Sequence, residues 1–177
     1  MKKLEKVRNN NHNEHKHTAF YQNGKAEVYP TLAETQIQDV NHQIEVLYTH
    51  LKINKYDHYP YYERLSTEKR EERQAEQAAI TMNISLMMEE RSRIYESMGA
   101  YAEALQSLVE ASESLFEENC DILNSLMGHG HPLEARLYAL DARCKELCSQ
   151  HPELWEQYRQ SGMKYLLANQ HLWPCER

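Results

Sequence analysis

Glycine and proline are scarce in this chain and lie far apart, and this limits its fold more than any other feature. Among 177 residues there are 5 Gly and 5 Pro, and none occurs between Pro60 and Gly99 or between Gly99 and Gly128. Barrels and sandwiches need many turns, and turns depend on these residues. Leu, Ala, Glu, Gln and Met fill the long intervals, and they favour helices. The sequence therefore predicts an all-α bundle of about five helices.

Helix signals divide the chain into five segments. Thr31 and Glu34 have the spacing of a capping box, which predicts that the first helix starts there. Apolar residues then recur at intervals of four and three as far as Leu51. Such a seam suits packing within a bundle or self-association into a homodimer. We expect the other helices over about 67–98, over 100–127, from Pro132 to about 150, and between Pro152 and Pro174.

The third segment, residues 100–127, carries the least ordinary feature of the sequence. Its apolar positions keep one phase at about 100° per residue, which predicts one continuous amphipathic helix. Gly99 either ends the preceding helix or bends it. The opposite face gathers Glu103, Glu110, Glu113, Glu117, Glu118 and Asp121. This acidic face indicates docking on a larger protein with a basic surface. The alternatives are a solvated face or pairing with Arg64, Lys69, Arg70 and Arg73.

Charge is unevenly distributed along the chain. Residues 1–30 hold six Lys or Arg and three Glu, a net charge of +3, so the rest must carry −10 to give the total of −7. Residues 1–17 are polar and are expected to form a disordered basic tail. A β-hairpin is expected within residues 18–30, because Asn23-Gly24 separates two β-prone runs. Residues 31–177 are expected to form a single helical domain. Direct binding of nucleic acid is not expected, because it requires a basic surface.

A cluster of tyrosines follows the first helix, beside Pro60. It includes Tyr59, Tyr61 and Tyr62. Tyrosine offers a large contact area at a low entropic cost, so the cluster would suit a protein interface. It would equally suit a cap on the end of the bundle, and the sequence leaves both interpretations open.

The cysteines raise the question of a metal site. Cys144 and Cys148 lie four residues apart on one predicted helix face, and His171 and Cys175 have the same spacing. Zinc accepts such ligands. However, Cys144 and Cys148 fall on an apolar stripe, where cysteine behaves as a small hydrophobe. We therefore predict core thiols, no metal and no cofactor, and keep a zinc-stabilised helical module as an alternative.

A short internal echo resembles a known repeat family. Gly99, Glu103 and Ala104 recur as Gly130, Glu134 and Ala135, with a further alanine seven positions on in each case. This resembles the second helix of a tetratricopeptide repeat, and the resemblance would imply a peptide-binding groove. The chain departs from that family in its spacing, which is 130 − 99 = 31 residues instead of about 34. Two alanine-rich amphipathic helices account for the echo equally well.

No catalytic or nucleotide-binding motif accompanies these features. The chain lacks a P-loop, G-x-G-x-x-G, G-x-S-x-G and H-E-x-x-H. Its longest uncharged apolar-rich stretch, residues 78–88, is far shorter than the ~20 residues of a membrane span, so we expect a cytoplasmic protein. The sequence favours a non-catalytic protein-binding module, such as an adaptor, a chaperone-like factor or an inhibitor. The main alternative is a nucleic-acid mimic that inhibits a DNA- or RNA-binding enzyme.

Overall fold

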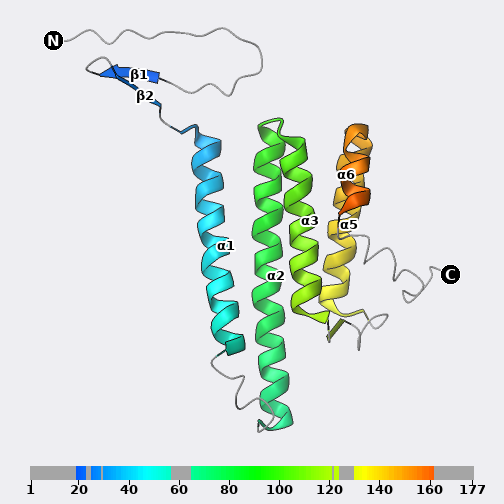
Figure 1. The fold of residues 1–177 in the computed structure, drawn as a ribbon. Helices are drawn as coiled ribbons and strands as arrows, with labels where there is room; N and C mark the ends of the chain where they lie inside the picture. The colour runs from blue at the N-terminus through cyan, green and yellow to red at the C-terminus, as the bar shows by residue number, and fades with distance from the viewer. Residues whose placement is uncertain are drawn as a thin grey trace.

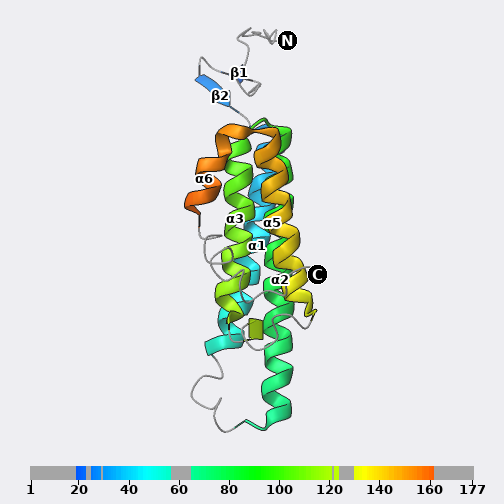
Figure 2. The same cartoon turned by 90° about the vertical axis from the view of Figure 1, so that its right-hand side faces the viewer.

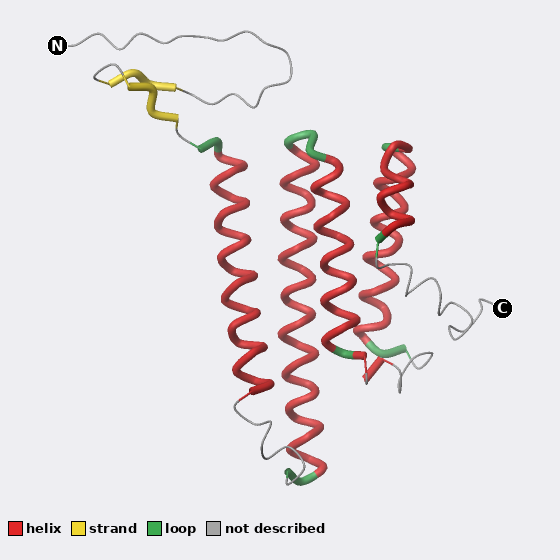
Figure 3. The backbone as a smooth tube through the Cα atoms, viewed as in Figure 1, coloured by secondary structure: helices red, strands yellow, loops and turns green. Residues whose placement is uncertain are grey.

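A computed structural model describes residues 19–22, 25–28, 30–56, 65–120, 122–123 and 130–161. It confirms the all-α bundle, in which α1, α2, α3 and α5 stand side by side (Figures 1 and 3). The elements, in chain order, are β1 Ala19–Gln22, β2 Lys25–Val28, α1 Leu32–Tyr56, α2 Thr67–Ser97, α3 Tyr101–Glu118, α5 Pro132–Gln150, the 3₁₀ turn η2 Pro152–Leu154 and α6 Trp155–Gln160.

The two strands pair as the antiparallel hairpin expected from the sequence. Ala19 lies opposite Val28, and Gln22 lies opposite Lys25. Asn23 and Gly24 lie outside the described residues, as does the predicted basic tail of residues 1–17.

The predicted capping box opens α1. The backbone N–H of Thr31 donates to Glu34 Oε2 at 2.6 Å, and the backbone N–H of Glu34 donates to Thr31 Oγ1 at 3.2 Å. Each bond satisfies an N–H group that has no partner inside the helix. In α5, Pro132 occupies the first turn as predicted, and His131 caps the helix by accepting from the N–H of Leu133 at 3.2 Å.

Gly99 separates α2 from α3, so residues 67–118 form two helices and not one bent helix. Its φ of 77° lies in the left-handed region that glycine adopts without strain. The N–H of Gly99 donates to the carbonyl of Glu96, and the N–H of Ala100 donates to that of Tyr95, both at 2.9 Å. This pair of bonds is a Schellman motif, which uses the last free carbonyls of α2 and reverses the chain.

The prediction of one continuous helix over residues 100–127 was wrong, because α3 ends at Glu118. Asn119 is buried, and its side-chain amide donates to the carbonyl of Leu115 at 2.8 Å and to Thr81 Oγ1 at 2.9 Å. An asparagine side chain that bonds the backbone competes with the helical pattern. Helical backbone resumes at Cys120, and Leu123 is buried like the apolar residues of α3. The helical spacing of apolar residues therefore continues across the break, and the sequence pattern gave no sign of it.

One hydrophobic cluster joins the helices. α2 packs against both α1 and α3, and α3 packs against α5. The largest side chains with almost no exposed surface are Ile84, Leu105, Leu108, Leu115, Leu123, Leu133, Leu137, Leu140 and Leu147. Burying a side chain of this size stabilises the fold by roughly 1.5–3 kcal/mol. Among the described residues, no helix combines the length and the apolar character needed to cross a membrane.

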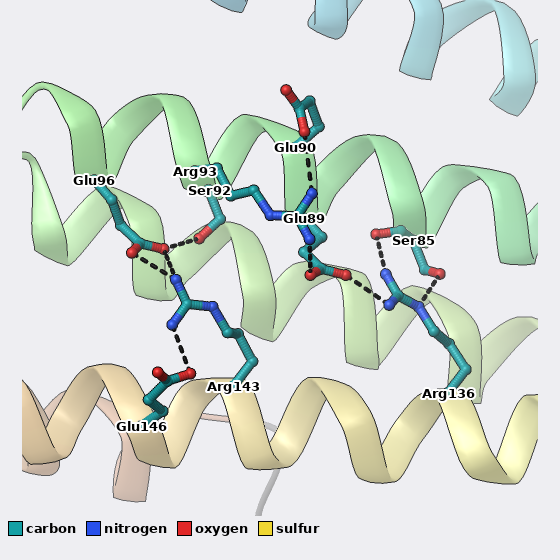
Figure 4. Close-up of polar contacts among 9 residues, drawn as sticks. All are labelled: Ser85, Glu89, Glu90, Ser92, Arg93, Glu96, Arg136, Arg143 and Glu146. Carbon is teal, nitrogen blue, oxygen red and sulfur yellow. Dashed lines mark hydrogen bonds and ion pairs between the residues drawn. The ribbon is translucent and has the colours of Figure 1, made fainter.

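Two sets of polar contacts connect α2 to α5, one around Arg136 and one around Arg143 (Figure 4). We call each set a rung. Arg136 reaches Glu89 at 2.6 Å and donates to both oxygens of Ser85 at 2.9 Å. Arg143 reaches Glu96 at 2.6 Å. The two glutamates are seven residues apart on α2 and the two arginines are seven apart on α5, so the helices run in the same direction.

The predicted last helix is interrupted after Gln160, and residues 162–174 of that prediction lie outside the described residues. The expected helix between Pro152 and Pro174 begins as η2 and continues as α6, which ends at Gln160. Tyr158 is buried, as its place in the apolar pattern predicted. Ser161, the last described residue, has an extended backbone.

Candidate protein-binding groove

An open groove of about 650 Å³ runs between α1 and α3, and residues of α2 form its floor. It exists because α1 and α3 pack on α2 and hardly on each other. α1 contributes Ile44, Glu45 and Tyr48, and α2 contributes Met88 and Arg91. The α3 wall carries Glu110, Glu113, Ser114, Glu117 and Glu118. We call this feature the α1–α3 groove.

Arg91 lies at the floor of the groove and contacts both walls. Its side chain is only 15% exposed. Nη1 donates to Asn41 Oδ1 of α1 at 3.0 Å, and Nη2 pairs with Glu110 Oε2 of α3 at 2.5 Å. Nε donates to Ser107 Oγ of α3 at 2.9 Å. One guanidinium therefore ties three helices together, and its charge is matched by a carboxylate as a buried arginine requires.

Two further contacts cross between the walls. The hydroxyls of Tyr48 and Ser114 are hydrogen bonded at 2.9 Å, and Lys55 forms an ion pair with Glu118. The ion pairs of Glu110 and Glu118 are therefore made with Arg91 and Lys55. The sequence had suggested Arg64, Lys69, Arg70 or Arg73 as partners for the acidic face, and Arg64 lies outside the described residues.

The charge of the groove is strongly negative. Five glutamates line it, against the guanidinium of Arg91 and the ammonium of Lys55, which pairs with Glu118. Glu45 on α1 and Glu117 on α3 are exposed on opposite walls, and neither has an ion-pair partner among the described residues. These two carboxylates are the ones most available to a cation from outside.

The predicted acidic face thus lines a groove and is not a flat outer surface. Four of its six members, Glu110, Glu113, Glu117 and Glu118, line the α1–α3 groove. Glu103 lines a second hollow of about 330 Å³, which shares Arg91 and Glu110 with the groove and also includes Gln157 of α6. Asp121 lies outside the described residues.

Sequence reasoning missed the contribution of α1. Asn41, Glu45 and Tyr48 lie beside the apolar seam of that helix. Nothing in the local sequence pattern shows that the acidic face of α3 lies opposite them. Arg91 did leave a signal, since it is a charged residue at a core-facing position of α2. A charge at such a position needs a buried partner, and Glu110 is that partner.

The tyrosine cluster is untested by the structure. Tyr59, Tyr61 and Tyr62 lie outside the described residues, so their role in an interface stays a prediction.

The cysteines of α5 are core residues. Cys144 and Cys148 are fully buried on its apolar stripe. Burial, and secondarily the nearby charge of Asp141, raises the pKa of Cys144 to about 12. The protonated thiol is a poor nucleophile and a poor metal ligand. In the part of the chain that the structure describes, no three His, Cys, Asp or Glu residues are grouped to hold a metal ion. His171 and Cys175 lie outside it.

The internal echo does not correspond to equivalent packing. Ala104 and Ala111 of α3 are buried, whereas their counterparts Ala135 and Ala142 of α5 are exposed. What the two copies share is a glycine with positive φ before the helix, 77° at Gly99 and 73° at Gly130.

Comparison of the chain with models of protein families, with curated proteins and with solved structures finds no match.

Proposed function

We propose that this protein is a non-catalytic protein-binding module, and that its α1–α3 groove receives a basic segment of a larger partner. The observation that supports this proposal is the arrangement of Glu45 and Glu117. Both are exposed, both lack an ion-pair partner among the described residues, and they lie on opposite walls of one groove. A lysine or arginine that enters the groove meets carboxylates from both sides.

The mixed character of the groove indicates what kind of segment fits. Ile44 and Met88 give it apolar contacts at the floor, whereas the carboxylates lie on the walls. A matching segment presents an apolar residue inward and Lys or Arg to either side, as an amphipathic helix does. Each exposed ion pair contributes only roughly 0.2–1 kcal/mol, so the charges mainly speed association and select the partner.

Affinity capture with matched charge variants tests the proposal. The full chain is immobilised, proteins from the native host are applied, and a salt gradient elutes them. The groove variant carries Glu45→Lys and Glu117→Lys. The control carries Glu71→Lys and Glu72→Lys, which make the same change in net charge at exposed positions of α2 outside the groove.

We expect one stoichiometric protein to be retained by the wild type and by the control, and to be lost from the groove variant. It should elute along the salt gradient, because the Debye length shortens from ~10 Å at 0.1 M to ~3 Å at 1 M. Circular dichroism should show equal helicity in all three proteins. Equal retention by both variants would refute the proposal.

The same experiment addresses nucleic-acid mimicry. If the retained protein is a nucleic-acid enzyme and duplex DNA displaces it, the acidic walls substitute for a phosphate backbone. The binding site on this chain would still be the α1–α3 groove, and the partner would be identified as an enzyme that acts on nucleic acid.

A further inference from the structure

α1 lies at one edge of the bundle, and α5 with α6 lies at the opposite edge (Figures 1 and 2). α1 packs on α2 and hardly on α3. Among the described residues, its 25 positions include three buried apolar side chains, Val40, Ile44 and Leu51. The 18 positions of α3 include six: Ala104, Leu105, Leu108, Val109, Ala111 and Leu115. Most of the hydrophobic cluster is therefore contributed by helices other than α1.

The contact between α1 and α2 is a seam between two helices. On α1, apolar residues recur at intervals of four and three: Ala33, Ile37, Val40, Ile44, Leu47 and Leu51. On α2, the same spacing links five residues: Ile80, Ile84, Met87, Arg91 and Ile94. Arg91 reaches Asn41 of α1 from this side of α2. Helices with such patterns pair along one stripe each, and the outer side of α1 stays exposed, at Val46 and Ile53 for example.

Separation of α1 from α2 leaves no buried charge without a partner. Arg91 makes only a neutral hydrogen bond with α1, donating to Asn41 Oδ1 at 3.0 Å. Its ion pair with Glu110 is made with α3 and stays intact. The ion pair between Lys55 and Glu118 does break, but these side chains are 40% and 25% exposed, so water replaces it at little cost.

The other long helices hold together without α1. α5 packs on α3 and also meets α2. Its buried apolar side chains are Leu133, Leu137, Leu140, Cys144, Leu147 and Cys148. The two rungs of Arg136 and Arg143 add polar contacts with α2. None of these contacts involves α1, so they stay in place when α1 separates.

We propose that α1 opens as a unit from a bundle of α2, α3 and α5 that stays folded. Opening removes the wall of the α1–α3 groove that carries Glu45 and Tyr48, and it uncovers Ile80, Met87 and Ile94 on α2. α1 is thus a built-in cover for an apolar stripe of α2, and the groove exists only while the cover is closed. The inference rests on the contacts of α1 and not on the proposed function, which concerns the closed form.

Hydrogen exchange of the full chain, without any partner, tests the proposal. The amides to compare are those of residues 40–51 in α1 with those of residues 104–115 in α3 and 137–148 in α5, all away from helix ends. The α1 amides should exchange about 100-fold faster than the other two sets, because they exchange through the smaller opening. They should still exchange at least about tenfold more slowly than in an unstructured peptide, because α1 is mostly closed. Urea should accelerate α3 and α5 more steeply, since global unfolding exposes more surface.

Two matched Leu→Ala substitutions distinguish the local opening from global unfolding. Leu140 of α5 and Leu51 of α1 are 0% and 3% exposed. Leu140→Ala destabilises the closed and open forms equally relative to the unfolded chain. The α3 and α5 amides should then accelerate at least about tenfold, and the α1 amides less than about twofold. Leu51→Ala weakens the closed form relative to both other states, so all three sets should accelerate by the same factor. If Leu140→Ala does not fold, the urea dependence of the wild type decides the matter.

Four results would overturn the proposal. The first is equal exchange of the three sets with equal urea dependence, which would make the bundle one cooperative unit. The second is an acceleration of α1 by Leu140→Ala that matches that of α3 and α5. The third is exchange of α1 as fast as in an unstructured peptide, which would mean that α1 does not close. The fourth is protection of α1 that rises with protein concentration, which would mean that a second copy holds it.

Discussion

The rung formed by Arg136 and Glu89 allows a quantitative test of how α2 and α5 are held together. The side chains are only 12% and 15% exposed, so both charges have lost most of their water. Arg136→Met removes the ion pair at 2.6 Å and two hydrogen bonds to Ser85. Breaking a buried pair costs ~3–5 kcal/mol because the other charge is left uncompensated. Here Arg93 still pairs with Glu89 at 2.6 Å, so we expect a smaller loss of about 2–3 kcal/mol.

The double variant Glu89→Met/Arg136→Met gives the sharper prediction. Two apolar side chains of similar volume leave no unpaired charge, so we expect the double variant to be more stable than Arg136→Met alone. The coupling free energy from the full cycle should exceed ~1 kcal/mol. Arg93→Met is the control, because the Arg93 side chain is 58% exposed and its loss should cost less than ~1 kcal/mol.

The assay is urea unfolding followed by circular dichroism, with free energies of unfolding compared at equal m-values. The reasoning is refuted if the two single substitutions add within ~0.5 kcal/mol. It is also refuted if Arg136→Met lowers the free energy of unfolding as little as Arg93→Met does. Either result would mean that water screens the rung far more than the side-chain burial indicates.

Two further predictions concern titration and the cysteines. Burial by itself would raise the pKa of Glu89, but the hydrogen bonds and charges of Arg136 and Arg93 outweigh it and lower the pKa. The stabilisation from Glu89 should therefore be complete above ~4.3, the pKa in the unfolded chain, and be lost as the pH falls through the lower folded value. Urea titrations between pH 3 and pH 6 should show that the free energy of unfolding falls less on acidification for Glu89→Gln than for the wild type. Parallel curves for the two proteins would contradict this. For the buried, protonated thiols of Cys144 and Cys148, we expect a thiol reagent to modify them only as fast as the protein unfolds, and metal analysis to find no stoichiometric zinc. Fast modification in native buffer, or near one equivalent of zinc, would contradict the core role.

Local sequence signals predicted the starts and ends of helices well. Thr31 with Glu34, and Pro132, are residue types whose chemistry suits a helix start whatever surrounds them. Gly99 marked a boundary for a similar reason. The sequence left open whether it bends or ends the helix, and the structure shows that it takes the positive φ of a turn.

The end of α3 could not be predicted in the same way. Asn119, the residue that follows α3, donates to Leu115 within the helix and to Thr81, which is 38 positions away in the chain. The apolar phase continues across the break, so periodicity suggested a helix that runs on to residue 127. The relevant contact is tertiary, and no local pattern records it.

The acidic face was predictable as a set of residues but not as a groove. Helical spacing alone placed Glu110, Glu113 and Glu117 together on one face. The hollow arises from the position of α1, which depends on how two helices share the surface of α2. The distance between two helices that pack mainly on a third is not encoded in the pattern of either helix.

The guanidinium of Arg91 has a consequence for how wide this groove can become. It is a rigid, planar group, and its two terminal nitrogens hold Asn41 on one wall and Glu110 on the other. The separation of α1 and α3 at this level is therefore fixed by the dimensions of one side chain. Under the proposed function, a segment that needs more room must first break one of these two bonds, whereas a segment that fits the existing width can bind without breaking either.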